Sequence, residues 1–263
     1  MSKIAIVTGG SSGIGRCVSA NLLESGCRVY EFSRRDNAAP GVVHISCDIT
    51  DERQVRQAVD EVASREGRID ILVNNAGFGI SGAAETTQSA ASHRQLEVNL
   101  FGADNAVRAV LPYMRQQRHG RILFMSSIAG IIPIPFQLWY SVSKSAILSY
   151  SLALQNEIRP FGITVCAIMP GDISSGFTDA RMKSEVGDDA YSGRIQRSVA
   201  VMEHDERNGM TPEYAAKVIA KYALKEKSRP MVALGLSYKG AAALAKLLPR
   251  GLSNRIVGSI YAK

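Results

Sequence analysis

Residues 4–15 read IAIVTGGSSGIG, an apolar run that passes directly into a glycine-rich turn. The run at 4–8 has the length and composition of a buried strand, and residues 13–25 continue as a helix. Because glycine has no Cβ, such a turn lets backbone N–H groups approach a pyrophosphate, and the helix N-terminus adds a partial positive charge. The stretch therefore predicts a dinucleotide-binding site. The residues expected around the phosphates are Gly9, Ser11, Ser12, Gly13, Ile14 and Gly15.

The remainder of the chain repeats this alternation of short apolar runs and longer amphipathic segments. Strands are expected at 4–8, 28–33, 42–46, 69–74, 121–126, 164–169 and 231–234. Helices are expected at 13–25, 51–65, 90–116, 140–159 and 211–225. This order is typical of β-α-β units, so we expect an α/β fold: a single doubly wound domain over residues 1–263 with a parallel sheet. Thr50 is the expected N-cap of the second helix, and Thr211 with Pro212 is expected to open the last.

The bulk composition is that of a soluble globular protein. The chain has 263 residues, of which 46% are hydrophobic and 21% charged, values ordinary for a globular protein. No apolar run approaches the roughly 20 residues that span a bilayer. The N-terminus enters the first strand almost at once, which leaves no room for a signal peptide, so a cytoplasmic location is expected.

Cysteine spacing speaks against a metal site. The four cysteines, Cys17, Cys27, Cys47 and Cys166, form no C-x-x-C pair and no cluster with histidine. Each lies in or beside an apolar stretch. We therefore expect buried free thiols and no bound metal.

The end of the second strand bears on the choice of dinucleotide. Residues 31–35 read EFSRR, so Ser33 stands where enzymes that prefer NAD usually place an acidic residue, and Arg34 and Arg35 follow. A guanidinium pairs with a 2′-phosphate through a forked geometry. NADP(H) is therefore favoured, with NAD(H) as the alternative if both arginines are solvated loop charges. Glu31 lies within the strand and is expected to point elsewhere.

Polar and small residues follow the third and fourth strands. Asp48 and Ile49 are placed to meet the adenine edge, although the aspartate could equally belong to the turn before the helix. Asn75, Ala76 and Gly77 follow the fourth strand, where small residues leave space for a ribose. These residues extend the predicted dinucleotide site along the carboxyl edge of the sheet.

Tyr140 and Lys144 are four residues apart and share one face of a predicted helix. A tyrosine with its ordinary pKa of about 10 is a poor acid or base at neutral pH, and a nearby ammonium is expected to lower that pKa. The phenol can then exchange a proton with a carbonyl or alcohol oxygen. Ser127, at a strand end, is expected to hydrogen-bond the same oxygen, and Asn99 to hold a water that links Lys144 to solvent.

Together these motifs resemble the short-chain dehydrogenase/reductase family over nearly the whole chain. The matching elements are TGGSSGIG, CDI, NNAG, Asn99, SSIAG, YSVSK and Pro170-Gly171. The resemblance implies a Rossmann-like, seven-stranded sheet and hydride transfer between a nicotinamide cofactor and a carbonyl or alcohol. It also implies a homodimer or homotetramer built through the helices that contain Asn99 and Tyr140.

The resemblance assigns roles residue by residue. The family's catalytic positions fall on Asn99, Ser127, Tyr140 and Lys144. Tyr140 and Lys144 are also implied in cofactor binding, the lysine through the nicotinamide ribose. The residues implied to line the nicotinamide are Pro170, Gly171, Ile173 and Ser175. Ser175 departs from the family's usual threonine, which keeps a hydroxyl but puts the local geometry in doubt.

Two segments break the regular rhythm. Residues 172–209 are long, polar and glycine-containing, and they follow a strand end; we expect a mobile substrate lid, with a disordered surface insertion as the alternative. Residues 237–263, the tail, carry apolar residues at helical spacing and a break at Pro249. These apolar residues are Ala241, Leu244, Ala245 and Leu248.

The tail is also basic. Its cations, which face no acidic residue in the tail, are Lys239, Lys246, Arg250, Arg255 and Lys263. Three alternatives stay open: the tail covers the substrate pocket, forms a subunit contact, or rests on an anionic membrane surface. A nucleic-acid partner is not expected, because aromatic residues do not interleave the charges.

The substrate is the least determined feature. Apolar residues between 131 and 139 and in the 172–209 segment suit a bulky apolar ketone or secondary alcohol, and a hydroxysteroid is favoured. A 3-keto lipid or a xenobiotic carbonyl compound is the alternative. Two other classes are weighed: a non-catalytic NADP(H)-binding regulator, which the four retained catalytic groups argue against, and a sugar-nucleotide epimerase, which is ranked last.

Overall fold

The computed structural model describes residues 2–227 and 229–262. Its main sheet has seven parallel strands in the order β3-β2-β1-β4-β6-β7-β9. The strand bounds are β1 (Ile4–Thr8), β2 (Arg28–Ser33), β3 (Val43–Ser46), β4 (Ile71–Asn74), β6 (Gly120–Met125), β7 (Ile163–Pro170) and β9 (Met231–Leu234). The doubly wound α/β fold is therefore confirmed. The strand order reverses between β1 and β4, where open α/β sheets bind ligands.

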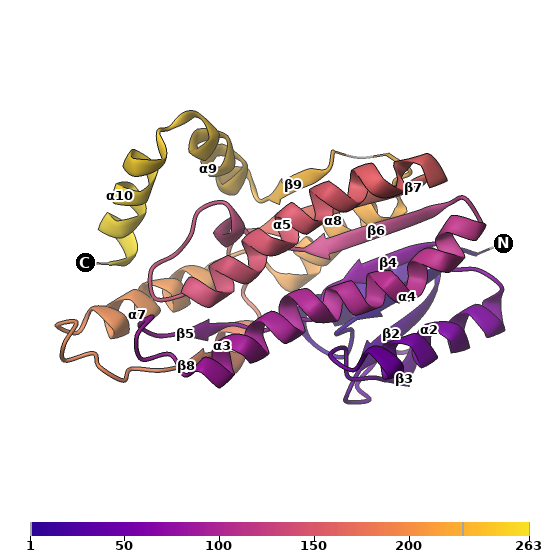
Figure 1. Ribbon diagram of the computed structural model, residues 1–263, viewed down its shortest axis with the longest axis horizontal. Helices are drawn as coiled ribbons and strands as arrows, with labels where there is room; N and C mark the ends of the chain where they lie inside the picture. Colours follow the sequence, from indigo (N-terminus) through magenta and orange to yellow (C-terminus); the bar gives the residue numbers. More distant parts are fainter. Residues whose placement is uncertain (1, 228, 263) are drawn as a thin grey trace.

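Helices cover both faces of this sheet (Figure 1). On one face lie α2 (Glu52–Glu66), α4 (Gly102–Gln116) and α5 (Leu138–Ile158). On the other lie α1 (Gly13–Glu24) and α8 (Pro212–Leu224). Apart from the edge strand β3, which is only partly buried, the strands are largely buried and consist mainly of apolar residues, as a sheet between two helical layers requires.

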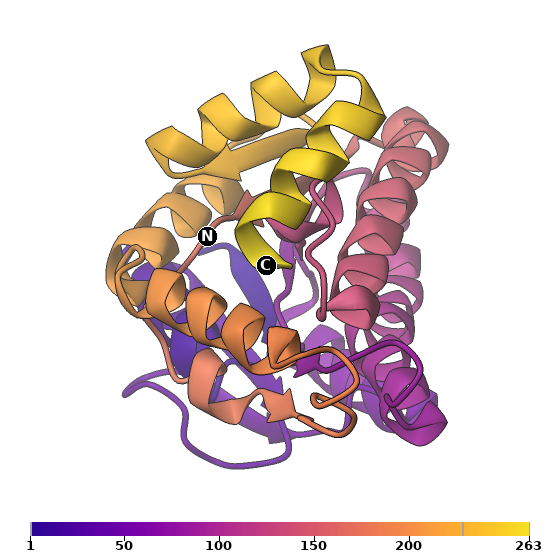
Figure 2. The same cartoon turned by 90° about the vertical axis from the view of Figure 1, so that its left-hand side faces the viewer.

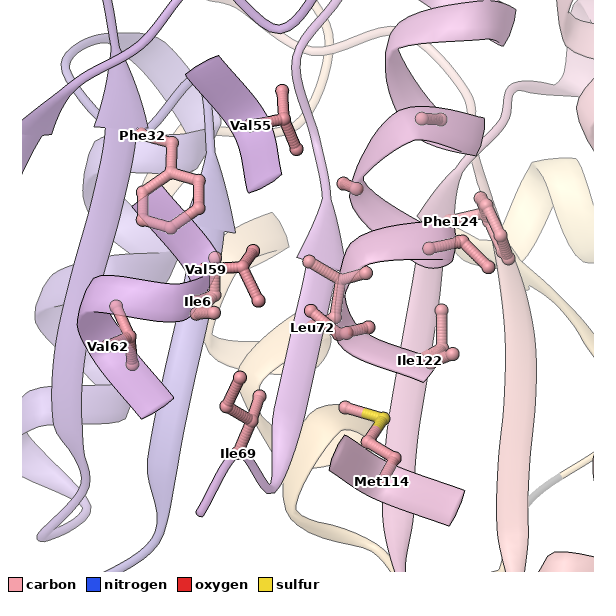
Figure 3. Packing of buried hydrophobic residues seen from close by; sticks show 14 of the residues in the cluster. Ile6, Phe32, Val55, Val59, Val62, Ile69, Leu72, Met114, Ile122 and Phe124 are labelled. Atoms are coloured by element: carbon pink, nitrogen blue, oxygen red, sulfur yellow. The ribbon is translucent and has the colours of Figure 1, made fainter. Parts of the chain in front are cut away.

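The core beneath α2 and α4 is dry and well filled (Figure 3). Side chains from the sheet, such as Ile6, Leu72 and Phe124, meet Val59 of α2 and Met114 of α4, and all five are fully buried. Burial of each such side chain contributes about 1.5–3 kcal/mol. This core fixes the strand ends that carry the site.

Of the two predicted N-caps, one is confirmed and one is wrong. The Thr211 hydroxyl accepts a hydrogen bond from the Tyr214 N–H at 3.2 Å, with Pro212 in the first turn, so Thr211 caps α8 as predicted. Thr50 does not cap α2. Asp51 does, accepting from the Arg53 and Gln54 N–H groups, because the Thr50 hydroxyl is engaged by Asp48.

The long helix expected at 90–116 contains a π-helical turn. It consists of α3 (Ser89–Leu96), the π-helical turn η1 (Glu97–Phe101) and α4, without a break in the chain direction. A π turn holds one residue more than an α turn and is often found at functional sites. Apolar periodicity alone did not reveal it.

Segment 172–209 crosses the carboxyl end of the sheet, and its expected mobility as a substrate lid remains a prediction. It contains α6 (Phe177–Ala180), β8 (Met182–Lys183) and α7 (Arg194–Arg207). β8 pairs in parallel with β5 (Ile80–Ser81), and the two form a small second sheet. The sequence did not predict this sheet, because strands of two residues are too short to show a periodic pattern. Short 3₁₀ turns, η2 (Ile128–Gly130) and η3 (Arg159–Phe161), flank α5.

The tail forms two helices, α9 (Leu236–Leu247) and α10 (Arg250–Tyr261), separated at Pro249. Figure 1 shows α7, β5, β8 and α10 gathered at one end of the molecule, and Figure 2 turns that end toward the viewer. Across the described residues, every helix is too short or too polar to span a bilayer.

The thiols and acidic side chains of the described residues form no metal-binding group. Cys27, Cys47 and Cys166 are buried free thiols and Cys17 is half-buried. Burial raises the pKa of Cys47 to about 12, so this thiol is unreactive at neutral pH.

Candidate active site

A cavity of about 980 Å³ runs along the carboxyl edge of the sheet, from the glycine turn past Tyr140 to the C-terminal helices. All but one of the site residues expected from the sequence line it. From the dinucleotide end they are Gly9, Ser11, Ser12, Gly13, Ile14, Gly15, Ser33, Arg34, Arg35, Asp48, Ile49, Asn75, Ala76 and Gly77. From the chemical end they are Ser127, Tyr140, Lys144, Pro170, Gly171, Ile173 and Ser175. The exception is Asn99, which lies behind the wall.

The glycine turn has the shape that a pyrophosphate needs. Gly9 and Gly13 have φ values of 67° and 50°, which favour glycine. A Cβ on Gly15 would lie 2.3 Å from both the Gly9 carbonyl oxygen and the Asn75 amide nitrogen. At the start of α1, Ser12 makes no side-chain capping hydrogen bond. The first N–H groups of α1 therefore remain available to an anion, and the residues present fit a dinucleotide.

Thr8 and Asn75 tie β1 to β4 beside this turn. The Thr8 hydroxyl accepts from the N–H groups of Asn75 and Ala76, each at 3.1 Å. The Asn75 amide in turn donates to the carbonyl oxygens of Thr8 and Gly9 at 3.1 and 3.2 Å. Thr8 was not predicted as a site residue, although its place directly before the paired glycines is a sequence signal for it.

Two arginines stand at the end of β2. Arg34 and Arg35 are exposed, line the cavity, and have no ion pair within the part of the chain that the structure describes. The Ser33 hydroxyl donates to the Arg35 carbonyl oxygen at 2.8 Å, which shapes the turn. Glu31 is fully buried against His44 and lies outside the cavity wall. At the end of β2, therefore, two cationic side chains line the cavity and the carboxylate of this strand does not.

Asp48 serves the turn after β3 while facing the cavity. It accepts from the Thr50 N–H at 3.0 Å and from the Thr50 hydroxyl at 2.7 Å. Burial raises its pKa, but these hydrogen bonds and the charges of Arg94 and Arg34 outweigh burial and lower it. The position of Asp48 is thus compatible with both roles that the sequence left open, contact with the adenine and a place in the turn before α2.

Tyr140 and Ser127 face each other at the centre of the cavity. Ser127 caps η2, accepting from the Ala129 N–H at 3.1 Å, and is hydrogen-bonded to Tyr140. Burial raises the pKa of Tyr140 to about 12, although the bond to Ser127 acts in the opposite direction. The expected lowering of this pKa is therefore wrong for the protein without its ligands, because desolvation dominates.

Lys144 is buried beside them. Its Nζ donates to the Met125 carbonyl oxygen at 2.8 Å and lies 5.5 Å from the centre of the Tyr140 ring. Burial lowers the pKa of Lys144 to about 8, since a charged ammonium is disfavoured away from water. The lysine therefore changes its charge within the physiological pH range.

Asn99 is held by the π turn and positions its neighbours. Its amide oxygen accepts from the Phe78 N–H, and its amide nitrogen donates to the Phe78 carbonyl and the Ser143 hydroxyl, all at 3.0 Å. Ser143 donates in turn to the Tyr140 carbonyl oxygen at 2.7 Å. Asn99 thus links the loop after β4 to the first turn of α5. The water expected at Asn99 remains a prediction.

The opposite wall contains charged residues that the sequence did not single out. Arg181 has a fully buried side chain that pairs with Glu206, and Glu206 also accepts from the Thr178 hydroxyl at 2.7 Å. Phe177 packs against Tyr140, with ring centres 5.7 Å apart. The sequence did not indicate that Arg181 and Glu206 belong to the site, because charged residues in a polar segment are usually exposed to solvent.

Asp172 differs from Glu206 in having no cationic partner. It accepts a hydrogen bond from the Tyr238 hydroxyl of α9 and lines the cavity, and it has no ion pair among the described residues. Burial raises its pKa and the charge of Asp205 adds to this effect, while the hydrogen bond from Tyr238 and the charge of Arg181 act in the opposite direction. The charges of Glu206, Arg181 and Asp172 all act on Tyr140, so this half-buried carboxylate lies near the reacting group.

The apolar lining comes mainly from the tail. Ala241, Leu244, Ala245 and Leu248 line the cavity, as do Ile256, Val257 and Ile260 of α10. In contrast, many apolar residues of segment 172–209 lie elsewhere. Ile195, Val199 and Met202 are buried away from the cavity. The apolar residues of the segment that face the cavity are Ile173, Phe177, Ala180 and Met182. Between 131 and 139, only Ile132, Ile134 and Gln137 do so.

Comparisons with known proteins agree with this geometry. The family model described as short chain dehydrogenase matches residues 3–186. A 3-ketodihydrosphingosine reductase from Bacteroides thetaiotaomicron is 42% identical over 227 residues, which cover 85% of this chain and 84% of that protein. The chain belongs to the short-chain dehydrogenase family. It is therefore an oxidoreductase that uses a nicotinamide dinucleotide.

Solved structures show the same fold as this short-chain dehydrogenase. A short-chain dehydrogenase from Streptomyces avermitilis matches with a TM-score of 0.81 and 30% identity, covering 94% of this chain and 93% of that chain. The structure of ElxO with NADP bound matches with a TM-score of 0.77 and 24% identity, covering 91% of this chain and all of that one (100%).

Proposed function

We propose that this short-chain dehydrogenase is an NADPH-dependent reductase of long-chain 3-keto lipids that carry an amino group beside the ketone. The observation that carries the proposal is the position of Asp172, an unpaired carboxylate in the cavity close to Tyr140. The relative from Bacteroides thetaiotaomicron, a 3-ketodihydrosphingosine reductase, supports the same substrate class.

The dinucleotide end holds the cofactor through the glycine turn and the start of α1. Arg34 and Arg35 would pair with a 2′-phosphate, since both face the cavity, have no ion pair among the described residues, and no carboxylate of β2 lines the cavity beside them. Pro170, Gly171, Ile173 and Ser175, at and after the carboxyl end of β7, line the cavity and would hold the nicotinamide. When bound, the cofactor supplies the hydride for reduction of the ketone.

Tyr140 donates the proton and Ser127 holds the carbonyl oxygen. A tyrosine with a pKa of about 12 remains protonated at neutral pH, which suits it to act as a general acid in the reductive direction. The Ser127 hydroxyl, already bonded to Tyr140, offers a second hydrogen bond to the same oxygen. Lys144 places a positive charge beneath the phenol and favours the phenolate left after proton transfer.

Asp172 recognises the cationic head of the substrate. In a 2-amino-3-ketone the ammonium is on the carbon next to the carbonyl, so its binding partner must lie close to Tyr140. Glu206 is already neutralised by Arg181, whereas the side chain of Asp172 accepts a hydrogen bond from the Tyr238 hydroxyl and has no ion pair among the described residues. A half-buried carboxylate gains substantially from an incoming cation.

The long alkyl chain of such a lipid lies along the tail. The cavity-facing positions from Ala241 to Leu248 are all apolar, and Ile256, Val257 and Ile260 of α10 continue this wall. Such a surface suits an alkyl chain. A hydroxysteroid is the second candidate, because the same apolar wall suits a polycyclic skeleton, but it offers no cation to Asp172.

A matched substrate panel tests the proposal. Purified protein is assayed by nicotinamide absorbance with a 2-amino-3-keto lipid, the same ketone without the amine, a 3-oxoacyl thioester and hydroxysteroids, each with NADP(H) and NAD(H). We expect turnover of the amino ketone with NADPH, reduced about tenfold or more when the amine is absent. Preferred turnover of a steroid would overturn the substrate, and dinucleotide binding without any turnover would favour a regulator.

A further inference from the structure

The formal charge of this chain is distributed very unevenly. All 24 acidic residues lie at or before Glu226, and the cations up to that residue balance them, so the whole net charge of +7 belongs to the residues that follow. Lys239, Lys246, Arg250 and Arg255 lie on α9 and α10 and are exposed. None of these four has an ion pair within residues 2–227 and 229–262.

The same helices expose large apolar side chains. Leu236 and Leu247 are 86% and 81% exposed, more than any other large apolar side chain in the described structure. With Gly240 and Ala243 they fall at helical spacing on one face of α9. The opposite face of α9 lines the cavity through Ala241 and Ala245. The outward face of α9 therefore has no packing role in the fold.

Side chains of both helices also reach the cavity mouth. Leu244, Ile256 and Ile260 line the cavity and are nevertheless about half exposed, at 52%, 43% and 50%. The apolar wall of the cavity is thus continuous with the outer apolar surface. Figure 2 shows α9 and α10 side by side above this end of the molecule.

We propose that α9 and α10 bind the surface of an anionic lipid bilayer. Exposed leucines insert between headgroups, while lysine and arginine side chains beside them pair with lipid phosphates. A protein partner would need a matching acidic groove, whereas the combination of scattered cations and protruding leucines suits a fluid, negatively charged surface. The docked face then places the cavity mouth at the bilayer.

Vesicle binding measures this directly, without relying on turnover or on the proposed substrate. The full chain is sedimented with phosphatidylcholine vesicles that contain or lack phosphatidylglycerol. We expect binding to the anionic vesicles and little to the neutral ones. K239Q/K246Q is expected to weaken binding about tenfold, and L236S/L247S to weaken it at least as much.

A matched control separates local from general charge effects. Lys217 and Lys221 on α8 are also exposed, and K217Q/K221Q removes the same charge from another face. Equal loss of binding in K217Q/K221Q and K239Q/K246Q would overturn the proposal, as would equal binding to neutral vesicles. A change in oligomeric mass in L236S/L247S would assign the face to a second copy of the chain instead.

Discussion

Tyr140 is the residue on which the proposed chemistry depends. Its side chain is half-buried in the cavity wall and hydrogen-bonded to Ser127. Desolvation raises the pKa of the phenol to about 12, so it is protonated at neutral pH. Replacing Tyr140 with Phe removes the proton donor and keeps the ring against Phe177. We expect reductase turnover to fall by about 10²–10⁴-fold, with dinucleotide affinity nearly unchanged. Activity near the wild-type level in this variant would contradict the assigned role.

Lys144 sets the pH dependence. Burial lowers its pKa to about 8, so the ammonium is present below that pH and is lost as pH rises through it, whereas Tyr140 keeps its proton until much higher pH. We expect kcat/KM for ketone reduction to be level at pH 6–7 and to fall above about 8. Lys144→Met should lower the plateau and remove this fall. The rate is measured from pH 6 to 9.5 in overlapping buffers. A wild-type rate that rises up to pH 9.5 would exclude this role of Lys144.

We predict that Arg34 favours NADPH over NADH. Arg34→Glu replaces a cation on the cavity wall with the acidic group typical of NAD sites. We expect the ratio of kcat/KM for NADPH to that for NADH to fall by about 10²-fold, since a forked charge-assisted contact is lost and a repulsive one gained. The same change at Arg16, whose guanidinium contacts the Asn37 carbonyl, serves as the control and should shift the ratio far less.

At the scale of elements, the buried Arg181–Glu206 pair fastens α7 to the short α6–β8 segment. Arg181→Met leaves a buried carboxylate without its partner, which typically costs about 3–5 kcal/mol. We expect reduced stability in denaturant and faster proteolysis between 177 and 207. The double variant R181M/E206M should recover much of the loss. If the single variant is as stable as wild type, this pair does not anchor the segment.

How much the sequence predicted also differs by element. Apolar periodicity predicted the seven strands of the main sheet and the helices α1, α2, α5 and α8. Local spacing predicted the glycine turn and the pair Tyr140 and Lys144. Each of these signals lies within one short segment of the sequence. Asp172 and Tyr238 could not be paired in advance, since their contact joins residues far apart in the chain. The π turn at Asn99 was missed because one extra residue in a turn leaves no compositional trace.

Tyr140's raised pKa was missed for a related reason. Sequence spacing gives the distance to Lys144 along the helix but not the depth of burial, and burial is the larger effect here. Similarly, the apolar residues of 172–209 were expected at the substrate, yet Ile195 and Met202 pack into the body. Composition tells which residues avoid water, not which of the available apolar surfaces they join.

At the scale of the whole molecule, α4 and α5 cover one face of the sheet (Figure 1) and leave exposed apolar side chains, including Val142 and Leu152 of α5. We predict that this short-chain dehydrogenase forms a homodimer or homotetramer through these helices. Leu152→Arg should lower the mass measured by sedimentation equilibrium, because a buried charge is costly at a subunit contact. An unchanged mass of the variant would show that the subunit contact lies elsewhere. A monomeric wild type would show that the chain does not form the predicted oligomer.

The uneven charge has a consequence for colloidal behaviour. With +7 confined to the residues after Glu226, the rest of the molecule is electrically neutral at pH 7, and mutual repulsion between copies comes from this C-terminal stretch, mostly from the tail. Proteins without net charge attract one another and precipitate more readily. Any surface that neutralises the tail therefore also removes the force that keeps copies dispersed, so that molecules gathered on it would tend to cluster there rather than spread evenly.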